Sequence, residues 1–356
     1  MTAPTRLTVP PLYCPLPSLM HPDVAEIARG SIEWLAGLGL FTHDGIREQM
    51  VRTRAAEWAC RIAPHSDRHR LQIVSDWTHL GFAIDDHRFD AGPLVDRPEA
   101  LIPLMMRLMP YLDHPEGPEG DDPFSIGFRD LSARARASAP ARVVRRWVEG
   151  NMEWFFAVAC LTAHRASGTM PSLSDYVNLG PRDRAMNLTG SLIELAEGTC
   201  LRDAERESPS VRAVTQAANM LVTIGNDLFS LNRETQHDVL ESNFVSVLRH
   251  ERGCTTEQAV REVVALHDRV MCRYLTLRKE IEPTATAAVR RHLSQLDHLI
   301  RGNLEWSLRV PRYHDDGAAA PTVLPWAERP GDDRPHAPPI PAIAWWWTGP
   351  SRPDAA

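Results

Sequence analysis

Apolar residues recur at three- and four-residue spacing along most of the chain from about residue 22 to residue 310. This spacing is that of amphipathic α-helices. Two of the clearest stretches are HPDVAEIARGSIEWLAGLGLF and DRHRLQIVSDWTHLGFAIDD. Several central stretches are apolar on most faces, which is typical of deeply buried helices, and alternating runs of strand type are absent. The pattern predicts an all-α fold, a single-domain helical bundle with a central apolar cavity.

The two ends of the chain depart from this helical pattern. Residues 1–20 are rich in proline, and we expect them to run extended across the surface of the bundle formed by residues 21–315. Residues 316–356 are rich in Pro, Ala and Asp without a helical period, which predicts a disordered tail. The AWWW sequence within this tail is unusual for a disordered segment.

Composition and charge narrow the class of protein. The net charge is −7 with no block of like charges, which argues against a nucleic-acid partner. No apolar run approaches the roughly 20 residues of a membrane span, and the N-terminus lacks a signal-peptide core. The six cysteines are scattered without a CxxC pair, as expected for reduced thiols in a cytoplasmic protein. A homodimer remains open.

Candidate chemistry first emerges in the stretch NDLFSLNRE, which follows the apolar run AANMLVTIG. Asn226, Ser230 and Glu234 are four residues apart, so on a helix they form one stripe. An amide, a hydroxyl and a carboxylate offer oxygen ligands that suit a hard cation such as Mg²⁺. Taken alone, a solvated polar stripe at a helix end explains this pattern equally well.

A second polar cluster ends another apolar helix, in the stretch FAIDDHRFD with Asp85, Asp86 and Asp90. Like charges at i,i+4 spacing repel by roughly 0.2–0.5 kcal/mol per pair, so a cation nearby would stabilise them. The alternative is a helix end entering solvent. Two such clusters on two apolar helices favour a shared cavity that binds divalent ions.

A third motif, Arg312 and Tyr313, follows the last apolar helix in WSLRVPRYH. An arginine can bind phosphate oxygens with two hydrogen bonds, and a tyrosine hydroxyl can donate one.

In this order and spacing, the motifs resemble those of the bacterial class I terpene synthases (terpene cyclases). DDHRFD resembles their aspartate-rich motif, and NDLFSLNRE matches (N/D)Dxx(S/T)xx(K/R)E with Arg233 at the basic position. Arg312–Tyr313 resembles their RY pair, and LYCPLPSLMHP their Pro-rich lead-in. The resemblance covers roughly residues 10–315. It implies three Mg²⁺ ions and the metal ligands Asp85, Asp86, Asp90, Asn226, Ser230 and Glu234.

The resemblance also implies the reaction. The partner would be a linear isoprenyl diphosphate, with farnesyl diphosphate favoured. Geranylgeranyl diphosphate is a close rival, because Gly81 and Ala83 are small residues beside the aspartate-rich motif. Ionisation and cyclisation would give a terpene hydrocarbon or alcohol and release diphosphate. The implied diphosphate ligands are Arg182, Arg233, Arg312 and Tyr313.

One departure concerns the diphosphate-binding arginine that the family carries on the helix before the second motif. Gly180 and Pro181 fall near that position, and Arg182 and Arg184 follow. We take Arg182 as the equivalent residue. The proline also predicts a kinked or broken helix here.

Aromatic side chains are candidates for stabilising carbocations, since each cation–π contact contributes roughly 0.5–2 kcal/mol. Ordinary core packing is the alternative for each of them. The candidates for the substrate pocket are Phe82, Trp77, Trp154, Phe155, Phe156 and Trp306.

Two other functions fit parts of the pattern. A chain-elongating isoprenyl diphosphate synthase would carry two DDxxD-type motifs, whereas the second motif here has the Asn/Ser/Glu form. A non-catalytic helical protein that binds apolar ligands would be expected to have lost a metal ligand, and none of the six positions is lost. The sequence contains no GxGxxG, P-loop, HExxH or GxSxG motif and no DxDD run.

Overall fold

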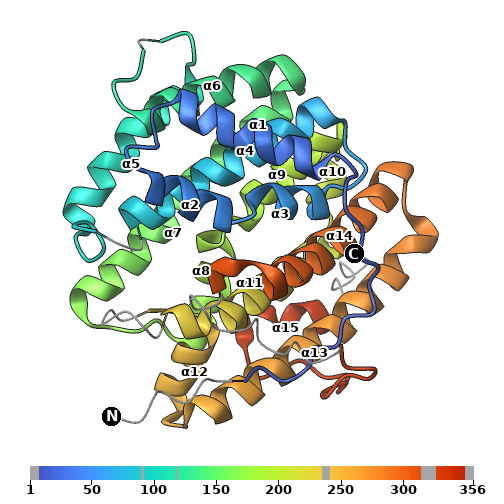
Figure 1. Ribbon diagram of the computed structural model, residues 1–356. Coiled ribbons are helices and arrows are strands. Elements are labelled where there is room, and N and C mark those ends of the chain that lie inside the picture. The colour runs from blue at the N-terminus through green and yellow to red at the C-terminus, as the bar shows by residue number, and fades with distance from the viewer. Residues whose placement is uncertain (1–7, 90–91, 118, 235–240, 314–325, 349–356) are drawn as a thin grey trace, which may run out of the picture.

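The structure, a computed structural model, describes residues 8–89, 92–117, 119–234, 241–313 and 326–348. Within these ranges all regular secondary structure is helical, which confirms the predicted all-α fold (Figure 1). The first half of the chain forms α1 Val24–Gly37, α2 Asp44–Arg52, α3 Ala55–Ile62, α4 Arg68–Ile84, η1 Asp85–Phe89, α5 Pro98–Asp113, α6 Pro123–Ser138 and α7 Ala141–Ser167. The second half forms α8 Leu173–Asp183, α9 Met186–Glu197, α10 Asp203–Arg206, α11 Pro209–Glu234, α12 Phe244–Arg252, α13 Thr256–Ile281, η2 Glu282–Thr284, α14 Ala287–Arg309, η3 Pro311–Tyr313 and α15 Pro341–Thr348.

Local sequence signals start and stop the helices that matter for the site. Asp67 precedes α4, and its side chain accepts hydrogen bonds from the first free backbone N–H groups of that helix. Thr286 does the same for α14. Gly168 ends α7 with φ of 64°, a left-handed conformation that glycine adopts without a steric penalty.

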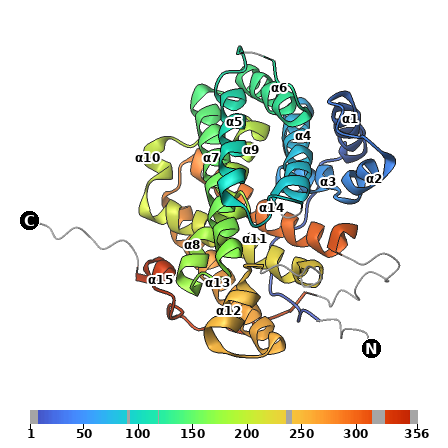
Figure 2. The same cartoon turned by 90° about the vertical axis from the view of Figure 1, so that its left-hand side faces the viewer.

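Helices α4, α7 and α11 each pack against several neighbours at the centre of the bundle. α4 packs against α3, α6 and α9, while α11 packs against α8, α13 and α14 (Figure 2). α7 packs against α5, α8 and α9. Large side chains such as Trp147, Phe128 and Tyr274 are fully buried between these layers. The apolar faces predicted from helical spacing are therefore the faces that form the core.

The described segments before α1 and after residue 325 both contact α13. Leu12, Cys14 and Leu16, in the extended segment before α1, are buried. Asp268 of α13 accepts hydrogen bonds from the backbone N–H of Tyr13 at 3.1 Å and of Gly331 at 2.7 Å. One buried carboxylate thus holds the N-terminal and the C-terminal segments together.

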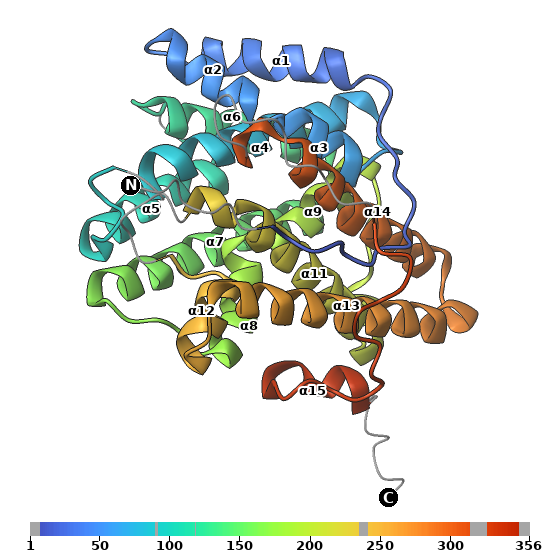
Figure 3. The same ribbon diagram turned by 60° about the horizontal axis from the view of Figure 1, so that its bottom comes forward.

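The structure differs from the predicted disordered tail for residues 326–348. The AWWW sequence lies in α15, where Trp346 is buried and donates from Nε1 to Gln216 at 3.2 Å. Arg273 of α13 donates to the carbonyl of Trp346 at 2.7 Å, and α15 lies on the outer side of the bundle (Figure 3). Burial of tryptophan therefore orders a segment that lacks an amphipathic period. The rest of the predicted tail, residues 314–325 and 349–356, lies outside the described residues.

Two further expectations from the sequence concern membrane-spanning segments and the state of the cysteines. No described helix combines the length and the apolar character that crossing a membrane requires. All six cysteines are free thiols, and burial raises the pKa of Cys60 to about 12.

Candidate active site

A cavity of about 140 Å³ lies between α4, α9, α11 and α14. Its polar lining residues come mainly from the C-terminal ends of α4, α8 and α11 and from η3, whereas earlier turns of α4 and α11 contribute apolar ones. The lining residues are Trp58, Trp77, Thr78, Gly81, Phe82, Asp85, Trp154, Asp183, Arg184, Ala185, Met186, Thr189, Val222, Asn226, Ser230, Asn303, Trp306, Arg312 and Tyr313.

The aspartate-rich motif begins where α4 changes its winding. Residues Asp85–Phe89 form a π-helical turn, a geometry that often occurs at functional sites. Asp85 lines the cavity, and Asp86 is buried beside it. Gln49 of α2 donates to Oδ2 of Asp86 at 3.1 Å. Asp90 lies outside the described residues.

The second motif meets the first across the same cavity. Asn226 and Ser230, one turn apart on α11, both line it. Asn226 donates from Nδ2 to the hydroxyl of Tyr313 at 2.9 Å, which leaves its amide oxygen as the group that can bind a cation. The side chains of Arg233 and Glu234 lie outside the described residues.

Arg312 joins the RY pair to the aspartate-rich motif. Its guanidinium donates to both carboxylate oxygens of Asp86, with 2.6 Å between Nη2 and Oδ1. It also stacks on Phe82, 4.8 Å from the ring centre. Burial lowers the pKa of Arg312, but the adjacent Asp86 carboxylate outweighs this effect, so the pKa is raised above its ordinary value. The buried Nε of Arg312 has no hydrogen-bond partner among the described residues, so an anion in the cavity could accept from it.

The predicted helix break lies later than Pro181. α8 continues through Pro181 to Asp183, and Ala185, with φ of 56°, separates α8 from α9. The break puts Arg184 on the cavity wall. Arg182 instead is exposed and donates to the carbonyl of Asn178 on its own helix at 2.6 Å.

Arg184 is held by the aspartate of the second motif. Asp227 is completely buried, and its Oδ1 accepts from Nη2 and Nε of Arg184 at 2.9 and 3.2 Å. Its Oδ2 accepts from the Tyr176 hydroxyl and from the backbone N–H of Phe244, both at 2.9 Å. Asp227 therefore positions an arginine at the cavity rather than facing it.

Four of the six predicted pocket aromatics line the cavity. Phe82 stacks on Trp306 with ring centres 5.7 Å apart, and Trp77 meets Trp154 edge-on at 5.7 Å. The indole N–H of Trp306 donates to the carbonyl of Thr53 at 3.0 Å, which fixes the ring.

The structure does not bring the other two aromatics to the cavity. Phe155 packs behind Trp154, between Phe89 and Phe128. Phe156 is 69% exposed, because consecutive residues of α7 point about 100° apart.

The donor set of the cavity fits a magnesium ion. Asp85, Asp86, Asn226 and Ser230 offer carboxylate, amide and hydroxyl oxygens, which are hard ligands. In the part of the chain that is described, no three His, Cys, Asp or Glu side chains gather as a metal site on their own. A cation here would therefore combine these oxygens with substrate phosphates and with Asp90 and Glu234, whose side chains lie outside the described residues.

Sequence reasoning missed several lining residues, including Trp58, Asn303, Met186 and Thr189. Trp58 is on α3, far from every motif, and donates to Asn303 at 3.1 Å. The break at Ala185 brings Met186 and Thr189 to the cavity. A run of small and polar residues between two helical patterns was the one signal for that break.

Comparisons with known proteins agree with this geometry. Residues 76–273 match the family model described as terpene synthase family 2, C-terminal metal binding. The chain is 33% identical to spiroviolene synthase of Streptomyces violens, over 96% of this chain and 97% of that protein. It is 34% identical to bonnadiene synthase of Allokutzneria albata, over 96% and 98% of the two chains.

A solved structure is similar to this chain over almost its whole length. A crystal structure of the SVS_A2 protein from ancestral sequence reconstruction superposes with a TM-score of 0.87 and 35% identity, covering 96% of this chain and 99% of that one. The chain therefore belongs to terpene synthase family 2 and is a class I terpene cyclase, a carbon–oxygen lyase that acts on diphosphates.

Proposed function

We propose that this cyclase uses Mg²⁺ to ionise a linear isoprenyl diphosphate and cyclises the allylic cation to a terpene hydrocarbon or alcohol, releasing diphosphate. The observation that carries the proposal is the meeting of Asp85, Asn226 and Arg312 on one aromatic-lined cavity, although they lie on three separate elements. Such convergence would not be expected of solvated helix ends.

The diphosphate end of the substrate would bind at the polar part of the cavity. Three Mg²⁺ ions would be held there by Asp85, Asp86 and Asp90 from one motif and by Asn226, Ser230 and Glu234 from the other. When bound, the ions supply positive charge that stabilises the diphosphate as it leaves. Arg184, in place of Arg182, would orient the diphosphate oxygens together with Arg233, Arg312 and Tyr313.

The hydrocarbon end would fold against the aromatic walls. Phe82, Trp306, Trp77 and Trp154 present ring faces and edges to the cavity, which favour positive charge by roughly 0.5–2 kcal/mol per cation–π contact. The same side chains exclude water and hold the chain in a reactive conformation.

We take farnesyl diphosphate as the favoured substrate and geranylgeranyl diphosphate as the second candidate. Relatives of this chain include an enzyme described as cyclizing (2E,6E)-farnesyl diphosphate and one described as a diterpene cyclase. Gly81 supports the longer substrate, since it lines the cavity and a Cβ there would already touch the Trp77 ring at 3.4 Å. A larger side chain at Gly81 would therefore occupy space that a longer chain could use.

The deciding experiment incubates the protein with geranyl, farnesyl and geranylgeranyl diphosphate, with Mg²⁺ or with excess EDTA. Hydrocarbon extracts are separated by gas chromatography with mass spectrometry, and released diphosphate is measured in parallel. We expect cyclic product from the C15 or C20 substrate with Mg²⁺ and none in EDTA. Gly81→Leu should reduce turnover of geranylgeranyl diphosphate more than that of farnesyl diphosphate. Full turnover in EDTA, or no product from any of the three, would overturn the proposal.

A further inference from the structure

A second cavity, of about 150 Å³, lies between α9, α11 and α14. We call it the rear chamber. Met186, the first residue of α9, lines both the rear chamber and the candidate active site. No other residue is shared by the two linings.

The two cavities follow one another along the same helices. On α11, Asn219 lines the rear chamber and Val222 the active site, a difference of three residues or about 4.5 Å of helix rise. On α14, Leu299 and Asn303 have the same relationship, about 6 Å apart along the axis. Met186 therefore stands at the short step between the two cavities.

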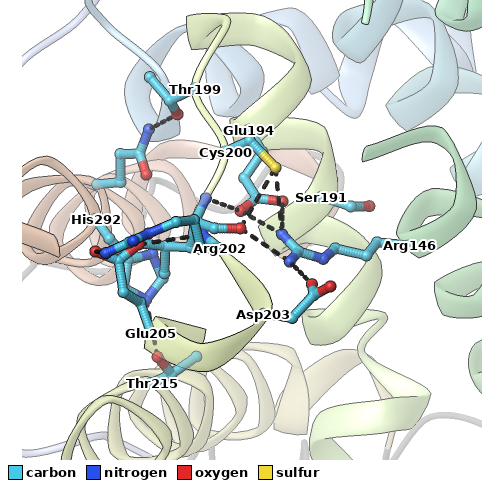
Figure 4. A network of polar contacts seen from close by, with 12 residues as sticks. Arg146, Ser191, Glu194, Thr199, Cys200, Arg202, Asp203, Glu205, Thr215 and His292 are labelled. Atoms are coloured by element: carbon cyan, nitrogen blue, oxygen red, sulfur yellow. Dashed lines mark hydrogen bonds and ion pairs between the residues drawn. The ribbon is translucent and has the colours of Figure 1, made fainter. Parts of the chain in front are cut away.

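The walls of the rear chamber combine apolar side chains, such as Ile193 and Leu299, with a set of polar groups. Glu194 accepts from Arg146 at 2.9 Å, and Thr215 shares a hydrogen bond of 2.8 Å with His292 (Figure 4). Gln295 donates to Glu197 at 2.8 Å and to Thr199 at 2.9 Å. A polar cavity holds water when each molecule finds about two to four partners and at least ~10–15 Å³ of space. The rear chamber has room and partners for several waters.

Water so close to the active site matters for the reaction proposed above. A carbocation is captured by any water that reaches it, so a cyclase that releases a hydrocarbon must exclude water. Met186 is 4% exposed, apolar and unbranched, the kind of side chain that fills an irregular gap.

We propose that Met186 is the partition that keeps water of the rear chamber away from the carbocation, so that this residue determines whether the product is a hydrocarbon or an alcohol. The inference rests on the proposed function. With the partition intact, a carbon next to the cationic centre loses a proton to the released diphosphate, and the C–H electron pair becomes the new C=C bond. With the partition open, a lone pair of water forms a C–O bond to the cationic carbon. The resulting oxonium then gives its extra proton to a second water of the chamber.

The test compares wild type with Met186→Ala and Met186→Leu in water enriched in ¹⁸O. Each protein is given the isoprenyl diphosphate that wild type accepts, and products are identified by mass spectrometry. We expect wild type and Met186→Leu to release unlabelled hydrocarbon. Met186→Ala should release ¹⁸O-labelled alcohol, with the ratio of alcohol to hydrocarbon raised about tenfold or more, a change of ~1.4 kcal/mol between the two competing barriers.

Ile193→Ala is the matched control. Ile193 is buried, lines only the rear chamber and also lies on α9. Its truncation enlarges the chamber without opening the partition, so the product should stay a hydrocarbon. Thermal unfolding checks each variant, and Met186→Val serves the same purpose if the alanine variant does not fold.

Three results would overturn the partition: unlabelled hydrocarbon from the truncated Met186 variant, labelled alcohol as the main product of wild type, or equal alcohol from Ile193→Ala. Failure of the proposed function looks different, since wild type would then convert no isoprenyl diphosphate at all.

Discussion

Asp86 and Arg312, which are 226 positions apart in the chain, form a buried ion pair at the candidate active site. Each was predicted for a separate task, one as a metal ligand and the other as a diphosphate ligand. In the structure the two side chains neutralise each other's charge in a hydrogen-bonded ion pair. Binding of Mg²⁺ and diphosphate would therefore exchange partners among groups that are already buried and paired.

This pair predicts a stability cost that the sequence did not suggest. Removing one of several repelling aspartates from a helix end should leave the fold intact or stabilise it. Because Asp86→Ala instead leaves Arg312 buried and unpaired, we expect unfolding to become easier by up to about 3–5 kcal/mol. Asp85, 3.9 Å from Arg312, should keep the loss near the lower end. Chemical denaturation measures the change.

The double variant Asp86→Asn/Arg312→Gln separates stability from catalysis. It restores a neutral hydrogen-bonded pair, so it should regain much of the lost stability but no turnover. A double variant that turns over at the wild-type rate would show that neither residue takes part in the reaction.

Local spacing was enough to predict that Asn226 and Ser230 share one helix face, and distance in the chain explains which other cavity residues were missed. Asn226 and Ser230 line one cavity because residues four apart on a helix share a face. No periodicity reveals that Trp58 or Met186 reaches the same cavity. These positions depend on the packing of α3 and α9 and on one left-handed residue, Ala185.

Two predictions were wrong for different physical reasons. Phe155 and Phe156 were both assigned to the pocket, but side chains of neighbouring helical residues diverge, and only Trp154 of that run faces it. The tail was predicted to be disordered from composition, yet Trp346 finds a site on α11 and α13. The composition of a segment does not reveal which parts of the folded protein it can pack against.

Arg184, not Arg182, should be the arginine whose loss damages turnover. A lost charge-assisted hydrogen bond costs roughly 1.5–3 kcal/mol, or about one to two decades in rate if the loss is felt in the transition state. Arg184→Ala should therefore cut kcat by about tenfold to a hundredfold. Steady-state kinetics with the accepted substrate measure this.

Arg182→Ala is the matched control, since Arg182 is two residues away and exposed. It should leave kcat within about twofold of wild type, because surface substitutions are usually nearly neutral. The reverse order of effects would mean that the helix break differs in the working enzyme.

Asp332→Asn should destabilise the protein although it lies in the segment predicted to be disordered. Asp332 accepts from Arg269 of α13 at 2.7 Å, and the side chains of both are 7% exposed. Because the variant leaves a buried arginine without its counter-charge, we expect a loss of up to about 3–5 kcal/mol. Asp333→Asn, next to it and exposed, is the control. Equal melting temperatures for the two variants would mean that residues 326–348 do not stabilise the bundle.

Acid should destabilise the folded protein through His292 of the rear chamber. Burial, with Arg206 and Arg146 nearby, lowers the pKa of His292 to about 4, whereas an unfolded histidine titrates near 6.5. Between these two values the unfolded chain binds a proton that the folded chain does not. The contribution of His292 to the free energy of unfolding is therefore complete above about pH 6.5. It falls as the pH drops towards 4, by up to roughly 3 kcal/mol.

Melting temperatures of two variants test this expectation. In His292→Gln the melting temperature should fall less steeply than in wild type between about pH 6.5 and 4. His250→Gln, on the exposed face of α12, should follow wild type. Parallel curves for all three proteins would show that His292 is not the group that links acid to unfolding.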